Sequence, residues 1–309
     1  MDKPRGEPFE SPEAFSLFGE PLHRSPIRLW LPSEEEAYRE KMRELEENRE
    51  KALRDYLADP DAPEKLLWLG RRTGILGRFN EAAVIYGEGV RRWPEDPRFY
   101  RFRGHRFAIL RRIDLAINDF RRAVELIEGR PDEPELYASG GPSKDKMGVA
   151  SFNWNVYYHQ GFTYFAAGML EEAAEAYRRC MEASDNLESR IATGHWLYMV
   201  LIRLGLRYEA ELLLEEVEPG LSLVEVGDYY QTLLMYKGHF TPEAVLGDAR
   251  AEGPVRFVTR AQAVGNLYLA EGRKSEAVKV FREVHATGQW TAGVHLLAEA
   301  ELLRLGVTP

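Results

Sequence analysis

Apolar residues recur along most of the 309-residue chain at the three- and four-residue spacing of an amphipathic helix. Residues 77–94, GRFNEAAVIYGEGVRRWP, place small and aromatic side chains on one helical face and charged side chains on the other. Similar stretches begin at Arg111, Gly168 and Gly272. A helix that recurs in this way predicts a stack of similar units rather than a single compact core.

The same pattern divides the N-terminal part of the chain into an arm and a helix. Residues 1–32 are rich in proline, glycine and charge, and we expect them to form an extended or disordered arm. Residues 33–59 are expected to form an N-terminal helix that Ser33 and Glu36 cap reciprocally. Its apolar stripe comprises Tyr38, Met42, Leu45, Ala52, Leu53 and Tyr56.

Glycine, alanine and aromatic residues then recur with a period of 34 residues, which is the distance from Gly70 to Gly104. A glycine on the first helix of a unit precedes an alanine and an aromatic residue on the second helix. These sets are Gly70, Ala82 and Tyr86; Gly104, Ala116 and Phe120; Gly161, Ala173 and Tyr177; and Gly265, Ala277 and Phe281. The small residues let two antiparallel helices approach closely, and the aromatic rings fill the space to the next pair.

This pattern resembles the tetratricopeptide repeat, and the resemblance implies an all-α fold. We expect a right-handed superhelix, or α-α solenoid, of about five to six helix pairs between the N-terminal helix and a C-terminal capping helix. Units 1–2 are expected in residues 63–127, and units 3–6 with the capping helix in residues 153–306.

One interval departs from the period, because Gly104 and Gly161 are 57 residues apart. Prolines and glycines fill the excess, so residues 128–152 are expected to form an insertion loop. The loop is either a tolerated surface insertion or a lid or docking loop beside the concave side.

The concave side of such a stack is lined by the first helix of each pair. The residues expected there are Arg71, Arg101, His105, Asn155, Tyr158, Phe162, His195 and Arg203, followed by Gln262 and Asn266. Arginine holds a carboxylate or phosphate with two hydrogen bonds, and the aromatic residues would add an apolar platform. This combination suits an acidic or C-terminal peptide segment. The alternative is that the arginines pair with glutamates of adjacent helices and that the aromatic residues belong to the core.

Composition and motifs narrow the possible functions. A net charge of -9 argues against a general nucleic-acid binder, and no apolar run is long enough to span a bilayer. The single cysteine and the seven scattered histidines provide no metal motif, and no nucleotide-binding or hydrolase motif occurs. We therefore expect no enzyme, no catalytic residues, no cofactor and no metal site. The compartment is left open: cytoplasmic as the sequence stands, or periplasmic if a leader was removed.

The C-terminal half, with GHWLYMVLIRLG, LLMYKGHFTPEAVL and VGNLYLAEGRKSEAVKVF, resembles the new-lipoprotein-I type of adaptor from bacterial envelopes. The chain as a whole also resembles a group of bacterial tetratricopeptide proteins related to those adaptors. The resemblance implies a homodimeric scaffold that presents envelope hydrolases to a protease. The chain departs from it in lacking an N-terminal cysteine that could accept a lipid, since Cys180 lies within a repeat helix.

The function expected from the sequence is thus a non-catalytic adaptor that binds a protein or peptide in its concave groove. Two alternatives remain: a groove that binds a small anionic ligand, such as a cell-wall fragment or a nucleotide, and a structural dimer or assembly subunit.

Overall fold

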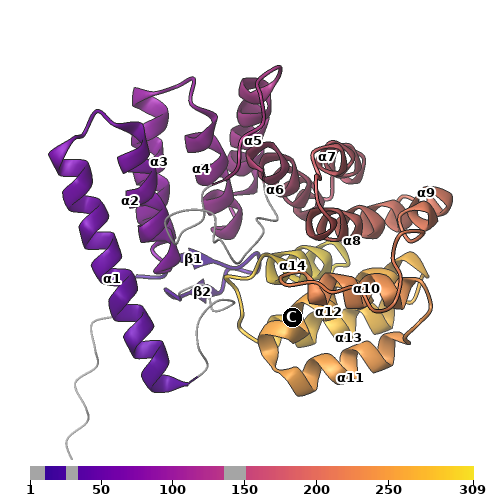
Figure 1. Cartoon of the computed structure of the whole chain (residues 1–309). Helices are drawn as coiled ribbons and strands as arrows, with labels where there is room; N and C mark the ends of the chain where they lie inside the picture. The colour runs from indigo at the N-terminus through magenta and orange to yellow at the C-terminus, as the bar shows by residue number, and fades with distance from the viewer. Residues whose placement is uncertain (1–10, 26–33, 136–150) are drawn as a thin grey trace, which may run out of the picture.

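The computed structural model describes residues 11–25, 34–135 and 151–309. This part of the chain is almost entirely helical, with one short two-stranded sheet (Figure 1). Its helices are α1 (Glu35–Ala58), α2 (Pro63–Ile75), α3 (Phe79–Arg92), α4 (Pro97–Ile109), α5 (Ile113–Ile127), α6 (Phe152–Ala167), α7 (Leu170–Glu182), α8 (Leu187–Arg203), α9 (Arg207–Leu212), α10 (Gly227–Tyr236), α11 (Pro242–Glu252), α12 (Pro254–Ala270), α13 (Lys274–Ala286) and α14 (Gly293–Arg304).

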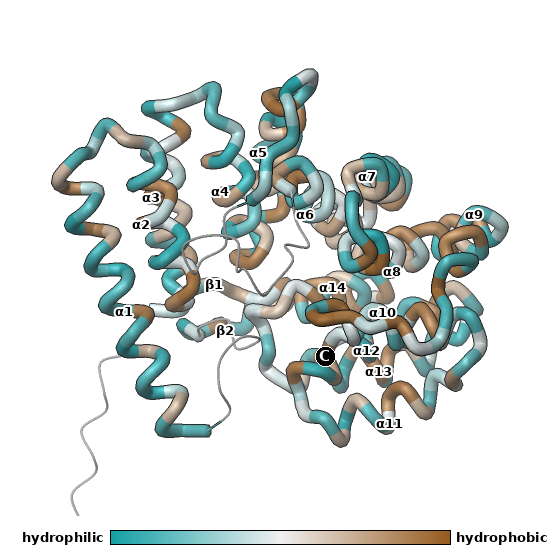
Figure 2. The backbone as a smooth tube through the Cα atoms, in the orientation of Figure 1, coloured by the Kyte–Doolittle hydropathy of each residue, from teal (hydrophilic) through white to brown (hydrophobic). Residues whose placement is uncertain are grey.

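Consecutive helices pack in pairs from α2/α3 to α12/α13, so the expected all-α repeat fold with five to six pairs is confirmed. Helix α1 precedes the first pair and packs against α2. It buries only Leu45 and Ala52, and most of its length is hydrophilic in Figure 2. The C-terminal helices carry longer apolar stretches, and most of them belong to one large core cluster.

The repeated glycines are required because aromatic rings lie directly against them. A Cβ atom at Gly70 would stand 2.4 Å from Cε1 of Tyr86, and one at Gly265 would stand 2.4 Å from Cε1 of Phe281. Both rings are fully buried, so they have no free space into which to move. The sequence period therefore reflects a close contact between the two helices of a pair.

The last helix is more deeply embedded than a capping helix would be. Nine consecutive residues of α14, Val294 to Leu302, are buried. Besides α13 and α12, the helix contacts α6 and α4, which lie in the N-terminal half of the molecule (Figure 1). The stack thus curves until its final helix meets the first helices of units 2 and 3 from their concave side.

The N-terminal arm also differs from the expectation, because residues 11–25 are not a free tail. Strands β1 (Ala14–Phe15) and β2 (Pro21–Leu22) form a small antiparallel hairpin. The carboxylate of Glu13 accepts a hydrogen bond from the backbone N–H of Asn80 at 2.6 Å, at the start of α3. Ser33, the expected cap of α1, lies outside the described residues, and Glu34 precedes that helix without a side-chain cap.

None of the helices within the described ranges is both long and apolar enough to cross a membrane.

Candidate functional site

The expected groove residues do lie on first helices of the pairs, but the structure separates them into two groups. Arg71, Arg101, His105 and Asn155 lie on α2, α4 and the first turn of α6. The second group, Tyr158, Phe162, His195 and Arg203, lies on α6 and α8. These residues contact other parts of the fold: Trp196, α10, and the helices α12 and α14 on the concave side.

The first group contains an arginine cluster, which we define as Arg71, Arg101 and Arg106 together with the carboxylate of Glu135. Nη2 of Arg101 donates to Oε1 of Glu135 at 3.0 Å, whereas Nε lies 2.9 Å from Oε2 without forming a hydrogen bond. Nη1 of Arg71 lies 3.8 Å from Oε1. Nη2 of Arg101 also donates to Oδ1 of Asn155 at 3.0 Å. The sequence analysis gave, as the alternative to a binding groove, arginines that pair with glutamates of adjacent helices. Arg71 and Arg101 do pair with a glutamate, but Glu135 belongs to a connection and not to a helix.

Arg106 is the member of the arginine cluster with the fewest partners. It is 9% exposed, and within the described ranges its Nε and Nη1 atoms have no hydrogen-bond partner. Its Nη2 lies 3.3 Å from Nδ1 of His105. Burial lowers the pKa of Arg106 to about 10, and the charges of Arg101 and Arg71 act in the same direction. The guanidinium remains charged at neutral pH, so among the described residues three cations surround one carboxylate.

Arg71 is the arginine of the cluster that lines a pocket open to solvent. Its guanidinium lies between two aromatic rings, 5.2 Å from the ring centre of Trp68 and 4.6 Å from that of Phe102. Such contacts hold a cation in place without neutralising it. A pocket of about 750 Å³ opens beside it, lined among others by Trp68, Arg71, Phe102, Trp93 and Glu135. The arginine cluster is therefore mostly buried but reachable along one wall of the pocket.

His105 faces His159 of α6, with 4.4 Å between the ring centres. Burial is the main reason that the pKa of each ring lies well below its usual value, and the nearby arginines add to it. Nδ1 of His159 lies 2.9 Å from the backbone oxygen of Asn155 and donates to it. The two rings are neutral near pH 7 and leave the positive charge of this region to the arginines.

Tyr158 belongs to an aromatic cluster rather than to an open platform. Nε1 of Trp196 donates to its hydroxyl at 2.5 Å, and this hydroxyl lies 3.1 Å from that of Tyr229. Burial raises the pKa of Tyr158 well above its usual value. These contacts fix the ring across α6, α8 and α10.

Phe162, His195 and Arg203 are engaged inside the fold. The ring of Phe162 lies so close to Gly293 of α14 that a Cβ atom there would stand 2.8 Å away. His195 is fully buried and its Nδ1 donates to Oγ1 of Thr232 at 2.7 Å. Arg203 pairs with Glu301 of α14 at 3.0 Å.

The two further residues, Gln262 and Asn266, are also fully buried. Nη1 of Arg203 donates to Oδ1 of Asn266 at 3.2 Å.

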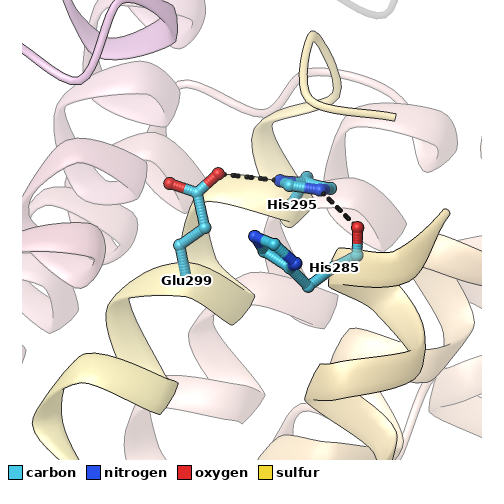
Figure 3. A group of neighbouring side chains, drawn as sticks. All are labelled: His285, His295 and Glu299. Carbon is cyan, nitrogen blue, oxygen red and sulfur yellow. Dashed lines mark hydrogen bonds and ion pairs between the residues drawn. The ribbon is translucent and has the colours of Figure 1, made fainter. Parts of the chain in front are cut away.

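A second polar group, the C-terminal clasp, joins distant parts of the chain. We define it as Arg111, His295 and Glu299 with the backbone N–H of Leu17. Glu299 is fully buried and accepts hydrogen bonds from Arg111 Nη2 at 2.6 Å and Leu17 N at 3.0 Å. Its Oε1 lies 3.0 Å from Nδ1 of His295 (Figure 3). Burial raises the pKa of Glu299, but the bonds from His295 and Arg111 outweigh that effect and hold the pKa at about 2.

His285, His295 and Glu299 bring their ligand atoms within 4.8 Å of one another, which is the spacing of a metal site (Figure 3). The donor set does not suit a cation. Both oxygens of Glu299 already bond to Arg111, whose charge would repel a metal ion, and Nε2 of His295 lies 3.1 Å from the backbone oxygen of His285. The group joins the arm, α4/α5 and α14 instead.

Five side chains of these two clusters were not among the site residues expected from the sequence: Arg106, Arg111, Glu135, His295 and Glu299. Arg111 had a signal that could have been used. The turn between the helices of a pair takes a glycine with positive φ at Gly77, Gly168 and Gly272, whereas Arg111 adopts φ 62° at the equivalent place. A non-glycine residue in this conformation indicates that its side chain is needed there.

The comparisons with known proteins agree with the repeat architecture. Residues 155–187, which contain most of α6 and all of α7, match the model of a tetratricopeptide repeat. No curated protein matches the sequence significantly.

Two solved structures show the extent of the structural likeness. One is a tetratricopeptide repeat protein from Parabacteroides merdae, 15% identical, with 84% of this chain and 96% of that chain covered and a TM-score of 0.46. The other is MamA, 17% identical, with 68% of this chain and 100% of that chain covered and a TM-score of 0.43.

Proposed function

We propose that the protein is a non-catalytic adaptor that binds an acidic or C-terminal segment of a partner protein beside the arginine cluster. The observation that supports this best is the pocket of about 750 Å³ on whose wall Arg71 is held between Trp68 and Phe102. A positioned guanidinium next to apolar surface is suited to a carboxylate attached to an apolar peptide. His105 and Asn155 support the arginines from the interior.

The experiment compares two arginine variants. Arg71→Gln removes a charge from the pocket wall, whereas Arg91→Gln removes an exposed charge on α3 whose side chain is 71% exposed. Fluorescence anisotropy with a panel of labelled peptides with acidic C termini should show binding about tenfold weaker for Arg71→Gln and unchanged for Arg91→Gln. If no peptide binds, or if both variants bind like the parent, the pocket is not the partner site.

Arg101 is unsuitable for this test despite its place in the cluster. It is 4% exposed and holds both Glu135 and Asn155. Arg101→Glu would place two carboxylates together in the interior, so a loss of binding would report unfolding.

The second candidate is a small anionic ligand, such as a cell-wall fragment or a nucleotide. The unpartnered Nε and Nη1 atoms of Arg106 favour an anion of some kind. Thermal-shift measurements with peptidoglycan fragments and nucleotides separate the candidates, because only a bound ligand raises the melting temperature with its concentration.

The third candidate is the homodimeric scaffold that the resemblance to envelope adaptors suggests. A dimer would not use α14, whose central residues are buried, but the exposed apolar side chains of Leu206, Tyr208 and Leu212 around α9. Light scattering at two protein concentrations tests it, and a monomer at both would rule it out.

A further inference from the structure

We infer that the arginine cluster is a carboxylate-binding site and that Glu135 is its internal ligand, which a carboxylate of a partner peptide displaces. This inference rests on the proposed function and adds to it the ligand chemistry and a means of regulation. Its support comes from three features of the described residues: the geometry of Glu135, the excess of positive charge, and the access from the pocket.

Glu135 is bound as a ligand would be. Its side chain is 10% exposed, and its Oε1 accepts a hydrogen bond from Nη2 of Arg101 at 3.0 Å. Its Oε2 lies 2.9 Å from Nε of the same guanidinium, but neither of these two atoms has a hydrogen-bond partner among the described residues. Nη1 of Arg71 lies 3.8 Å from the same Oε1. An ion pair between a guanidinium and a carboxylate, strengthened by a charge-assisted hydrogen bond, is a contact by which arginine binds peptide carboxylates. The site thus already shows which chemical group it accepts.

Glu135 also comes from a connection between helices rather than from a helix. It follows Pro134 in the connection after α5, outside any helix. This connection is tied to the start of α6 by the hydrogen bond from Phe152 N to the oxygen of Glu133 at 2.7 Å and by the isolated bridge between Pro134 and Ser151. The side chain of Glu135 can therefore leave the arginines without unwinding a helix.

The charges favour an additional or replacing anion. Arg71, Arg101 and Arg106 provide three positive charges, and within the described ranges Glu135 forms ion pairs with Arg71 and Arg101 but not with Arg106. Two buried nitrogens of Arg106 have no partner among the described atoms. Buried cations without partners are unfavourable, so a carboxylate that also reaches the free nitrogens of Arg106 gains from their desolvated state.

Access is provided by the pocket, because Arg71 and Glu135 both lie on its wall. A peptide carboxylate that enters along Trp68 and Phe102 reaches the guanidiniums at the place where Glu135 meets them. The peptide can bind only to molecules in which Glu135 has left the arginines. Its apparent affinity is therefore the intrinsic affinity multiplied by the fraction of such molecules.

The test uses Glu135→Ala, with Glu133→Ala as the matched control, since Glu133 lines the same pocket but is exposed. Loss of the internal ligand should lower the melting temperature of Glu135→Ala, and acetate at millimolar concentrations should restore it with saturation. Acetate should leave the parent protein and Glu133→Ala unchanged. If acetate does not raise the melting temperature of Glu135→Ala above the effect of equal chloride, the arginine cluster is not a carboxylate site.

A second measurement addresses displacement. An acidic octapeptide with a free C terminus should bind Glu135→Ala at least about tenfold more tightly than the parent protein, and its C-terminally amidated form should distinguish the α-carboxylate from side-chain carboxylates. Equal affinity for both proteins would show that Glu135 does not compete, and would overturn the inference while leaving the proposed function intact. Acetate rescue without peptide binding to either protein would support the carboxylate site but refute the peptide adaptor.

Discussion

Replacing Gly265 with alanine tests the close helix contact on which the repeat depends. The added Cβ would stand 2.4 Å from Cε1 of Phe281, whereas carbon atoms pack at about 3.5–4.0 Å, so the ring must move by about 1 Å. Phe281 is fully buried, so its close-packed surroundings leave no free space into which the ring can move. Overpacking of this kind costs up to about 3 kcal/mol, and the higher helix propensity of alanine returns about 1 kcal/mol. We expect Gly265→Ala to lower the free energy of unfolding by about 2 kcal/mol.

Gly247 of α11 provides the matched control. It also lies within a helix, but it is exposed and a Cβ atom there would meet no atom within 4 Å. Gly247→Ala should therefore stabilise the protein by about 0.5–1 kcal/mol, because only the propensity difference acts. Urea denaturation followed by circular dichroism measures both variants, which should differ by about 3 kcal/mol.

A double variant identifies the ring as the cause. In Gly265→Ala with Phe281→Leu, the smaller side chain makes room for the new methyl group, so the two changes together should cost about 1–2 kcal/mol less than their sum. If Gly265→Ala stabilised the protein as much as Gly247→Ala, or if the two changes were additive, the close contact would not explain the repeated glycine.

The remaining predictions concern the clasp, a buried histidine and the cysteine. Arg111→Gly should relieve the positive-φ backbone, worth about 1 kcal/mol, but should still destabilise the protein by about 2–4 kcal/mol in urea denaturation because Glu299 loses its buried partner. Burial lowers the pKa of His195 to about 3, so the unfolded chain takes up a proton below pH 6.5 that the folded chain refuses. Stability should therefore fall as the pH drops from 6.5 toward 3, by about 1.4 kcal/mol per pH unit from this residue, and His195→Gln should reduce the measured slope by that amount. Cys180 is fully buried, and burial raises the pKa of its thiol, so labelling by a thiol reagent should proceed only as fast as the protein unfolds in urea.

The helix pairs and their glycines could be predicted from the sequence because they depend on contacts between neighbouring elements. Gly70 and Tyr86 are 16 residues apart, and the same arrangement recurs at Gly161 and Gly265. Repetition makes such a pattern visible in a single sequence, since each unit must solve the same packing problem. The positions of the groove residues on first helices follow from the same periodicity.

What surrounds those residues could not be predicted in the same way. Glu299 and Glu301 are charged residues that would be expected on a helix surface, yet both are buried. Arg111, the partner of Glu299, is 188 residues away in the sequence, and Arg203, the partner of Glu301, is 98 residues away. A buried carboxylate is tolerated only where such a partner exists, and local sequence contains no information about it.

The sequence by itself thus determined an all-α stack with a 34-residue period, because period and packing are set by neighbouring helices. Only the tertiary structure decided that α14 returns to the concave side and that Glu135 occupies the guanidiniums of Arg71 and Arg101. The return of α14 depends on the sum of the small rotations between successive helix pairs. That sum in turn decides which charged residues, distant in the sequence, lie close enough to form ion pairs.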